Sequence, residues 1–486
     1  MEALPPTGVP AEEVLAELRA LRSRDLPTHG GRLFAYVFDP AVPGLDHLTA
    51  SAHALSAHVN GLDPTAFPSV PALENDLVAA SARLLGAGPG TAAPDVVGTV
   101  TSGGTESILL AVKAARDGRR DVATPRMIMP TTAHPAFAKG AAAFRVAVDV
   151  VPVDPATMRP DPAAVAAAIT ADTVLVVCSA PSYPHGVIDP VSPIAAAALE
   201  RGVRCHVDAC FGGWTLPYLR RLGVEIPPFD QSVPGVTSIS VDLHKYAYCP
   251  KGVSVLLHRD AALRRPLYFA YAGWPGYTLV NSVLASTRSG GPIAAAWATL
   301  RHIGDDGYLA LAGRTREAVR GLVTAVSTVD GLRIVGDPTT GTVVCFASDD
   351  DSLDVLVLAD ELGARGWHAQ VQLRYGEIPP TVHLTVTPAV APSVPEFGPA
   401  LAAAARAARA AGPAKPPAEL LALAPGLTAD DLTPEFVAQV AGSLGLGSGA
   451  PVRMAEVNAL LTEVSPALRE GLVAEFLSHI QTPAWQ

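Results

Sequence analysis

The residues best suited to chemistry lie in the stretch from Ser240 to Gly252. An apolar run, Gly235 to Val241, has the composition of a buried strand, and it ends in a polar turn that places His244 beside Lys245. An ammonium loses hydration at the end of a buried strand, so such a lysine persists if its pKa drops or if it forms an imine. The plain alternative is a lysine whose charged end reaches solvent.

Three groups upstream fit the same chemistry. The turn Thr101 to Ser107 has two glycines at the start of a helix, where free N–H groups favour an anion; no lysine follows the second glycine, so it is not a P-loop. Asp208 ends an apolar run and needs a cationic partner. His134 opens a helix, and its ring could stack on a flat cofactor. Taken singly, these groups could equally be a capped turn, a helix N-cap and a surface histidine.

Together they form a phosphate cradle, a ring stack, an acid for a pyridine nitrogen and an imine-forming lysine. These are the parts that bind pyridoxal 5'-phosphate. We therefore expect this cofactor, and we expect a catalytically silent scaffold to lack Lys245 or Asp208, both of which are present.

The elements that must position these groups alternate between short β-rich runs and Ala-rich helices from residue 96 onward. Such alternation predicts an α/β protein with a mostly parallel sheet, and the motifs fall at the carboxyl ends of its strands. An N-terminal helical arm precedes this region, with helices expected at 11–22, 47–59 and 72–85. A smaller C-terminal α+β domain with a helical tail follows. The expected domain limits are 1–71, 72–320 and 321–486, with a Gly/Ser linker at 445–449.

Composition excludes several classes of protein. Of the 486 residues, 49% are hydrophobic and 17% charged, which indicates a globular protein, and the net charge of -11 argues against a nucleic-acid partner. The five cysteines show no paired short spacing, so we expect neither disulfides nor a metal site. The N-terminus lacks the pattern of a secretory signal and no run of about 18 apolar residues occurs, so we expect a cytoplasmic protein without a membrane span.

The chain resembles the group II, fold-type I PLP-dependent decarboxylase superfamily, and within it the sphingosine-1-phosphate lyase branch. The blocks that carry the resemblance are TSGGTESILLAVKAARD (101–117), AHPAFAKGAAAF (133–144), APSYPHGVIDPV (180–191), HVDACFGGW (206–214), GVTSISVDLHKYAYCPKG (235–252) and SGGPIAAAW (289–297). The resemblance covers most of the chain from about residue 31. It implies the fold of PLP-dependent transferases and a homodimer with shared active sites.

The resemblance also implies roles for individual residues. Lys245 would hold the cofactor covalently, Asp208 would pair with its pyridine nitrogen, and His134 would stack on its ring. The cofactor phosphate would be held by Gly104, Thr105 and His244, with Thr287 reaching it from the neighbouring subunit. The substrate would be contacted by Tyr36, Asp63, Tyr183 and Lys251, of which Tyr183 and Lys251 would do acid–base and positioning work. For Tyr36, a rim position without a role is an equal alternative.

One departure from the family concerns the substrate head group. The family carries Asn-Pro-Leu-His-Pro near its substrate phosphate, whereas this chain has Asn60-Gly61-Leu62-Asp63-Pro64. A desolvated carboxylate beside a phosphate would be repulsive. Asp63 therefore either enters the pocket and favours an unphosphorylated or cationic head group, or turns away and caps the following turn.

The reaction that the resemblance implies is a retro-aldol cleavage. A long-chain amino alcohol, phosphorylated as in sphingosine 1-phosphate, would be split into an aldehyde and a (phospho)ethanolamine. The alternative on the same scaffold is an amino-acid decarboxylase, which would need a cation such as Arg288 or Lys251 for the substrate carboxylate.

Overall fold

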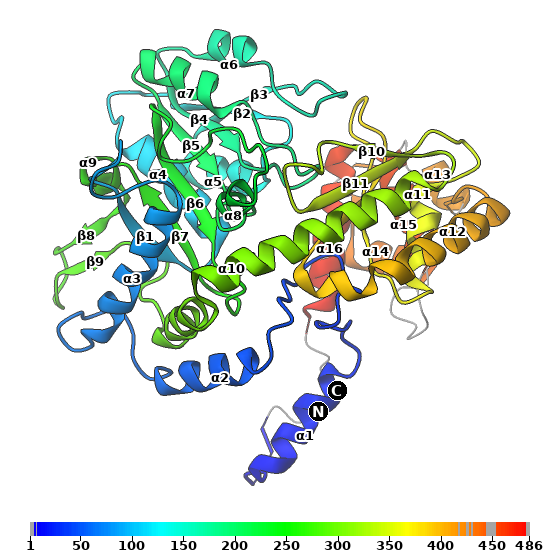
Figure 1. Ribbon diagram of the computed structural model, residues 1–486, viewed down its shortest axis with the longest axis horizontal. Helices are drawn as coiled ribbons and strands as arrows, with labels where there is room; N and C mark the ends of the chain where they lie inside the picture. Colours follow the sequence, from blue (N-terminus) through cyan, green and yellow to red (C-terminus); the bar gives the residue numbers. More distant parts are fainter. Residues whose placement is uncertain are drawn as a thin grey trace.

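A computed structural model describes residues 4–5, 7–416, 418–423, 427–428, 431–443 and 453–482. Its larger part is built on a seven-stranded sheet in the order β1-β7-β6-β5-β4-β2-β3 (Figure 1). Six strands run in one direction and β7 runs against them. The strands are β1 Val97–Thr101, β2 Arg126–Pro130, β3 Ala147–Val151, β4 Thr173–Ser179, β5 Arg204–Asp208, β6 Val236–Asp242 and β7 Ser254–His258. The predicted mostly parallel α/β sheet is therefore confirmed.

Helices follow the strands and cover both faces of this sheet. They are α4 Gly104–Asp117, α5 Ala136–Phe144, α6 Pro162–Ala168, α7 Val191–Glu200, α8 Leu216–Arg221 and the short α9 Ala261–Arg264. Every residue of β4 is buried, and its side chains alternate: Leu175 and Val177 pack in the cluster with α4 and α5, while Val176 and Cys178 pack in the cluster with α7. This layering brings the loops after β1, β2, β4, β5 and β6 to one edge of the sheet.

The N-terminal arm consists of α1 Ala11–Arg22, α2 Leu45–Leu55 and α3 Ser69–Leu84. The second helix is shorter than predicted, because the chain turns at residues 56–59 before it pairs Asn60 with Ser289. Helices α2 and α3 pack against α10, whereas α1 buries none of its residues. In Figure 1, α1 projects away from the rest of the molecule.

Helix α10, Gly290–Ser327, runs from the large sheet to the smaller domain and bends at Gly304, whose φ is +65° (Figure 1). The smaller domain has an antiparallel sheet in the order β10-β11-β13-β12, and its α+β character is as predicted. Its elements are β10 Leu332–Val335, β11 Val343–Ser348, α11 Val355–Gly363, β12 Gln370–Gln372, β13 Thr381–Thr385, the 3-10 helix η2 Pro388–Ser393 and α12 Val394–Ala411. Phe34, from the arm, packs in this domain's core against Trp367 and Phe397.

The described part of the tail is helical, with α13 Ala418–Leu423, α14 Pro434–Ser443, α15 Met454–Glu463 and α16 Pro466–Ile480. The helices α14 to α16 bury a separate apolar cluster that includes Val437, Leu460 and Leu468. The Gly/Ser linker predicted at 445–449 lies outside the described residues. Among the described residues, none of the helices combines the length and apolar character that crossing a bilayer requires.

A small hairpin was not predicted from the sequence. After the 3-10 helix η1 Arg265–Leu267, strand β8 Phe269–Tyr271 pairs with β9 Leu279–Asn281. Each strand has only three residues, too few to show an alternating pattern. The hairpin exposes several large side chains to solvent, namely Tyr268, Phe269, Tyr271, Trp274, Tyr277 and Val280.

Candidate active site

The loops at the carboxyl edge of the large sheet enclose a cavity of about 380 Å³. Seven of the residues singled out in the sequence line it: Gly104, Thr105, His134, Tyr183, Asp208, His244 and Lys245. They come from five separate strand ends, as expected where parallel strands finish at one edge. The structure thus gathers at one place groups that are up to 141 positions apart, from Gly104 to Lys245.

The glycine-rich turn leads directly into α4. Gly104 is the first residue of that helix, and a Cβ at this position would lie 2.7 Å from Oδ2 of Asp242 and 2.8 Å from Sγ of Cys210. Only glycine therefore fits. Glu106 accepts hydrogen bonds from the backbone and hydroxyl of Ser102, at 2.7 and 2.8 Å, which holds the turn in place. The residues at the start of α4 line the cavity, and the free N–H groups of a helix start can bind an anion.

Asp208 ends β5 and is buried at the cavity wall. Its Oδ1 accepts hydrogen bonds from the backbone N–H of Cys210, at 3.0 Å, and from Oγ of Ser240, at 3.4 Å. Nearby, the backbone N–H of Ala136 donates to Nδ1 of His134 at 3.1 Å, and burial lowers the pKa of this imidazole. The result is a fixed carboxylate next to a neutral, flat ring.

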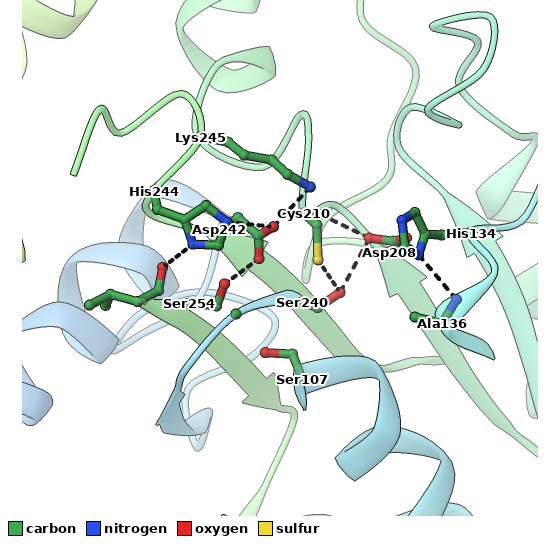
Figure 2. A network of polar contacts seen from close by, with 12 residues as sticks. Ser107, His134, Ala136, Asp208, Cys210, Ser240, Asp242, His244, Lys245 and Ser254 are labelled. Atoms are coloured by element: carbon green, nitrogen blue, oxygen red, sulfur yellow. Dashed lines mark hydrogen bonds and ion pairs between the residues drawn. The ribbon is translucent and has the colours of Figure 1, made fainter. Parts of the chain in front are cut away.

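Lys245 forms an ion pair that the sequence analysis did not anticipate. Its Nζ lies 2.8 Å from Oδ2 of Asp242, the last residue of β6, and Figure 2 shows the two side chains pointing toward each other. Burial acts to lower the pKa of Lys245, but the charge of Asp242 outweighs it and the pKa is raised. Asp242 precedes Lys245 by three residues in the same turn, but this spacing alone does not show that the two side chains meet.

His244 lies on the other side of Asp242 (Figure 2). Its Nδ1 is 3.0 Å from the backbone oxygen of Val253, and its Nε2 is 3.6 Å from Oδ2 of Asp242. A carbonyl can only accept, so Nδ1 carries the hydrogen. Burial lowers the pKa of this imidazole as well.

Tyr183 reaches the cavity from the loop after β4 and meets the smaller domain. Its ring stacks on His383 with centroids 4.6 Å apart, and its hydroxyl donates to Oε1 of Gln370. Burial raises the pKa of this phenol. Gln370 lies 187 positions away in β12, so its contact with Tyr183 could not be read from the sequence.

Lys251 borders an adjoining cavity of about 670 Å³, which shares His244 with the first. Its Nζ lies 5.2 Å from the centre of the Phe38 ring. Burial lowers the pKa of this amine, and the nearby charge of Lys245 acts in the same direction. Lys251 is thus near the candidate site without lining the cavity around Lys245.

Besides Lys251, three of the predicted site residues do not line the Lys245 cavity in the described chain: Tyr36, Asp63 and Thr287. Tyr36 has a φ of +66° and borders a different cavity. Thr287 donates to Oδ1 of Asn60 at 3.2 Å, so the two segments near Asp63 and Thr287 lie together.

The Asp63 carboxylate is turned toward its own loop. Its Oδ1 accepts hydrogen bonds from the backbone N–H of Thr65 at 2.8 Å, from the Thr65 hydroxyl at 2.6 Å and from the N–H of Ala66 at 3.3 Å. These hydrogen bonds lower the pKa of Asp63. Of the two arrangements considered from the sequence, the structure contains the turn-capping one.

The residues present fit pyridoxal 5'-phosphate. Gly104 leaves open the space that a side chain would fill, at the anion-favouring start of α4. A neutral imidazole, a buried carboxylate and a primary amine surround the same cavity. These groups match the phosphate, the pyridine ring, its nitrogen and the aldehyde of the cofactor.

Comparison with known proteins agrees with this fit. The family model for the pyridoxal-dependent decarboxylase conserved domain matches residues 32–348, and a model for a C-terminal helix-turn-helix domain of pyridoxal-dependent enzymes matches residues 418–479. The chain is 36% identical to the sphingosine-1-phosphate lyase of Dictyostelium discoideum, over 79% of this chain and 70% of that protein. It is 37% identical to that of Arabidopsis thaliana, over 82% and 72%.

Solved structures give the same result. The sphingosine-1-phosphate lyase of Burkholderia pseudomallei superposes with a TM-score of 0.78 at 38% identity, covering 84% of this chain and 93% of that one. The glutamate decarboxylase of Lactobacillus brevis superposes with a TM-score of 0.74 at 20% identity, covering 84% and 95%, which shows a shared fold alone.

Proposed function

Because this chain belongs to the pyridoxal-dependent decarboxylase family, and within it to the sphingosine-1-phosphate lyases, we propose that it is a PLP-dependent aldehyde-lyase. Its substrate would be a long-chain amino alcohol, phosphorylated as in sphingosine 1-phosphate, and its products an aldehyde and phosphoethanolamine. The observation that carries the proposal is the convergence of Lys245, Asp208 and His134 with the Gly104 turn on one cavity.

Each residue has a task that follows from its surroundings. Lys245 would attach the cofactor, and the start of α4 would hold its phosphate. The phosphate charge would favour the protonated form of His244, whose Nε2 would then donate to it. When bound, pyridoxal phosphate supplies an electron sink for the pair released as a carbon–carbon bond breaks. Asp208 would keep the pyridine nitrogen protonated. The substrate hydroxyl must lose its proton as the aldehyde forms. Tyr183, whose phenol remains neutral because burial raises its pKa and whose own hydrogen goes to Gln370, would accept a hydrogen bond from that hydroxyl and position it.

A decarboxylase would need a cation for the substrate carboxylate. Arg288, one of the two candidates, makes a two-pronged ion pair with Glu74 through its Nε and Nη2 atoms. Its guanidinium is therefore already matched by a carboxylate. Lys251 remains a candidate to bind a substrate carboxylate, so an assay must distinguish the lyase reaction from decarboxylation.

We also propose a homodimer with shared active sites. The Thr287 and Asn60 segments contact each other but lie away from the Lys245 cavity of their own chain. The β8–β9 hairpin, which exposes Phe269, Tyr271 and Trp274, is joined to the site through Glu106, whose Oε1 accepts from the N–H of Leu284 at 2.9 Å. Exposed aromatic side chains of this kind are typical of protein interfaces. A second copy that covers the hairpin would bring Thr287 toward a cofactor phosphate.

A nucleic-acid partner is not part of the proposal, although residues 418–479 match a helix-turn-helix model. This segment contains eight acidic residues and only two basic ones, Arg453 and Arg469. Nucleic-acid binding depends on neutralising phosphates with basic side chains.

The test is a panel of amines assayed for two products at once. The purified enzyme with added cofactor is given a phosphorylated long-chain amino alcohol, its dephosphorylated form, glutamate and aromatic amino acids. Release of a long-chain aldehyde without carbon dioxide supports the lyase; carbon dioxide from an amino acid would establish the decarboxylase instead. Lys245→Ala serves as the control and should yield neither product.

A further inference from the structure

The carboxylate of Asp242 occupies an unusual position. Its side chain is only 2% exposed, and it lies at the end of β6, beneath the glycine turn that would hold a phosphate. A carboxylate so close to a bound phosphate would be repelled by it, unless a cation compensates for its charge. In the described structure that carboxylate is in contact with the Lys245 amine (Figure 2).

The surroundings fix this carboxylate in place. The hydroxyl of Ser254, on the neighbouring strand β7, donates to Oδ1, which leaves Oδ2 for Lys245. The backbone N–H of Asp242 donates to the oxygen of Cys210 at 3.3 Å. Burial would raise the pKa of Asp242, but the charges of Lys245 and His244 and the hydrogen bonds lower it. Asp242 is therefore a preorganised, ionised partner for an ammonium.

Other charged groups also face Lys245, but in different roles. Asp208 lines the same cavity, and among the described residues no ion pair joins it to Lys245; Cys210, next to Asp242, is a neutral thiol because burial raises its pKa. Lys251 is close enough for Lys245 to affect its pKa, and His134 is affected by both carboxylates. Asp242 alone among these groups is in hydrogen-bond contact with Nζ in the described chain.

We propose that Asp242 is a positioning residue that receives the Lys245 ammonium whenever this amine is not attached to the cofactor. The proposal rests on the proposed function. A substrate amine that took over the bond to the cofactor would release Nζ, and two protons would pass to Nζ from the substrate ammonium. Asp242 would hold the resulting lysine ammonium near the carbon to which it must return.

The test measures the free lysine directly, in protein freed of cofactor. Reductive methylation by formaldehyde and cyanoborohydride attacks only the unprotonated amine, and mass spectrometry quantifies each lysine. Lys139, which is exposed, gives the internal standard. Removing the neighbouring negative charge should lower the pKa of Lys245, so Asp242→Asn should raise its labelling rate at about pH 8, relative to Lys139, by at least about tenfold.

Asp208→Asn is the matched control, because it removes one carboxylate from the same cavity without touching Nζ. Its effect on the labelling ratio should be less than about threefold, which corresponds to a shift of about half a unit in the pKa of Lys245. Equal labelling of Lys245 in wild type and Asp242→Asn, or equal increases in the two variants, would overturn the proposal. Circular dichroism checks folding, and Asp242→Ser takes the place of Asp242→Asn, with the same expected result, if the latter does not fold.

This readout is independent of the substrate. A positive labelling result with a failed amine panel would keep the role of Asp242 and reject the lyase assignment. Aldehyde release with unchanged labelling would support the lyase assignment and reject the role of Asp242.

Discussion

Two carboxylates at neighbouring strand ends have different partners. Asp208, at the end of β5, accepts from Cys210 and Ser240, while Asp242, at the end of β6, holds Lys245. The strands are adjacent and parallel, with Asp208 in register with Ser240, so the two acids end neighbouring strands and line the same cavity. Their different partners suit a site in which one acid serves the cofactor nitrogen and the other the lysine.

Asp208→Asn should lower turnover far more than it lowers stability. An amide cannot keep a pyridine nitrogen protonated, and the loss of one such electrostatic group typically costs about a hundredfold in kcat. The amide oxygen can still accept from the N–H of Cys210, so Tm should shift by only a few degrees. Steady-state kinetics and a thermal melt measure both; a large fall in Tm that parallels the loss of rate would indicate a purely structural Asp208.

Asp63→His should leave the head-group preference unchanged. The carboxylate of Asp63 accepts three hydrogen bonds from its own turn, so it acts as a turn cap. The ratio of kcat/KM for a phosphorylated long-chain amino alcohol to that for its dephosphorylated form should stay within about twofold of the wild-type ratio, about 0.4 kcal/mol. A large gain for the phosphorylated substrate alone would show that Asp63 faces the pocket in the working enzyme.

A buried hydrogen bond behind the cavity holds one of the strand ends in place. Asp189 is fully buried; its Oδ2 accepts from the N–H of Ser179 at 2.7 Å, and Ser179 pairs in register with Asp208. Burial raises the pKa of Asp189 to about 7. This residue thus holds the end of β4 beside the strand that carries Asp208.

The raised pKa of Asp189 should make stability depend on pH. Between its ordinary pKa of 3.8 and about 7, the folded protein retains a proton that the unfolded chain has lost. This contribution is fully present below pH 3.8 and is lost as the pH rises toward 7, by on the order of 1 kcal/mol per pH unit. Asp189→Asn, which cannot ionise, should therefore gain in Tm relative to wild type from about pH 5 to pH 7 and then level off. A constant difference in Tm across that range would contradict the assignment.

At the scale of the molecule, the smaller domain and the arm both reach the site. Gln370 in β12 accepts from Tyr183, and Phe38 from the arm lies beneath Lys251. The large sheet therefore supplies the cofactor residues, while the other parts complete the surroundings of the substrate. The aromatic hairpin is exposed to solvent, and Thr287 does not line the Lys245 cavity of its own chain.

Mixing two inactive variants tests whether sites are shared. Lys245→Ala removes the covalent attachment, and Thr287→Asp places a negative charge where a partner's phosphate is expected. In a mixed two-fold dimer one of the two sites has both residues intact, so random exchange should restore about a quarter of the wild-type activity. Native mass spectrometry confirms that mixed dimers form. Mixed dimers without activity, or an active monomer in sedimentation, would reject shared sites.

The sequence by itself determined the elements and most of the site. Apolar runs and helix-start turns are local features, so the strands ending at Thr101, Asp208 and Asp242 could be located without coordinates. Because parallel strands finish at one edge of a sheet, the motifs that follow them were also expected to meet. Seven predicted residues line one cavity for this reason.

Only the tertiary structure decided which of these groups touch. The contact of Tyr183 with Gln370 and that of Asn60 with Thr287 join positions 187 and 227 residues apart, which no local pattern encodes. The reversed direction of β7 and the pairing of the short β8 and β9 depend on neighbours in space. Even the ion pair of Asp242 with Lys245, three residues apart, needed coordinates, because the direction of each side chain is set by the packing of β6, β7 and α4 around it.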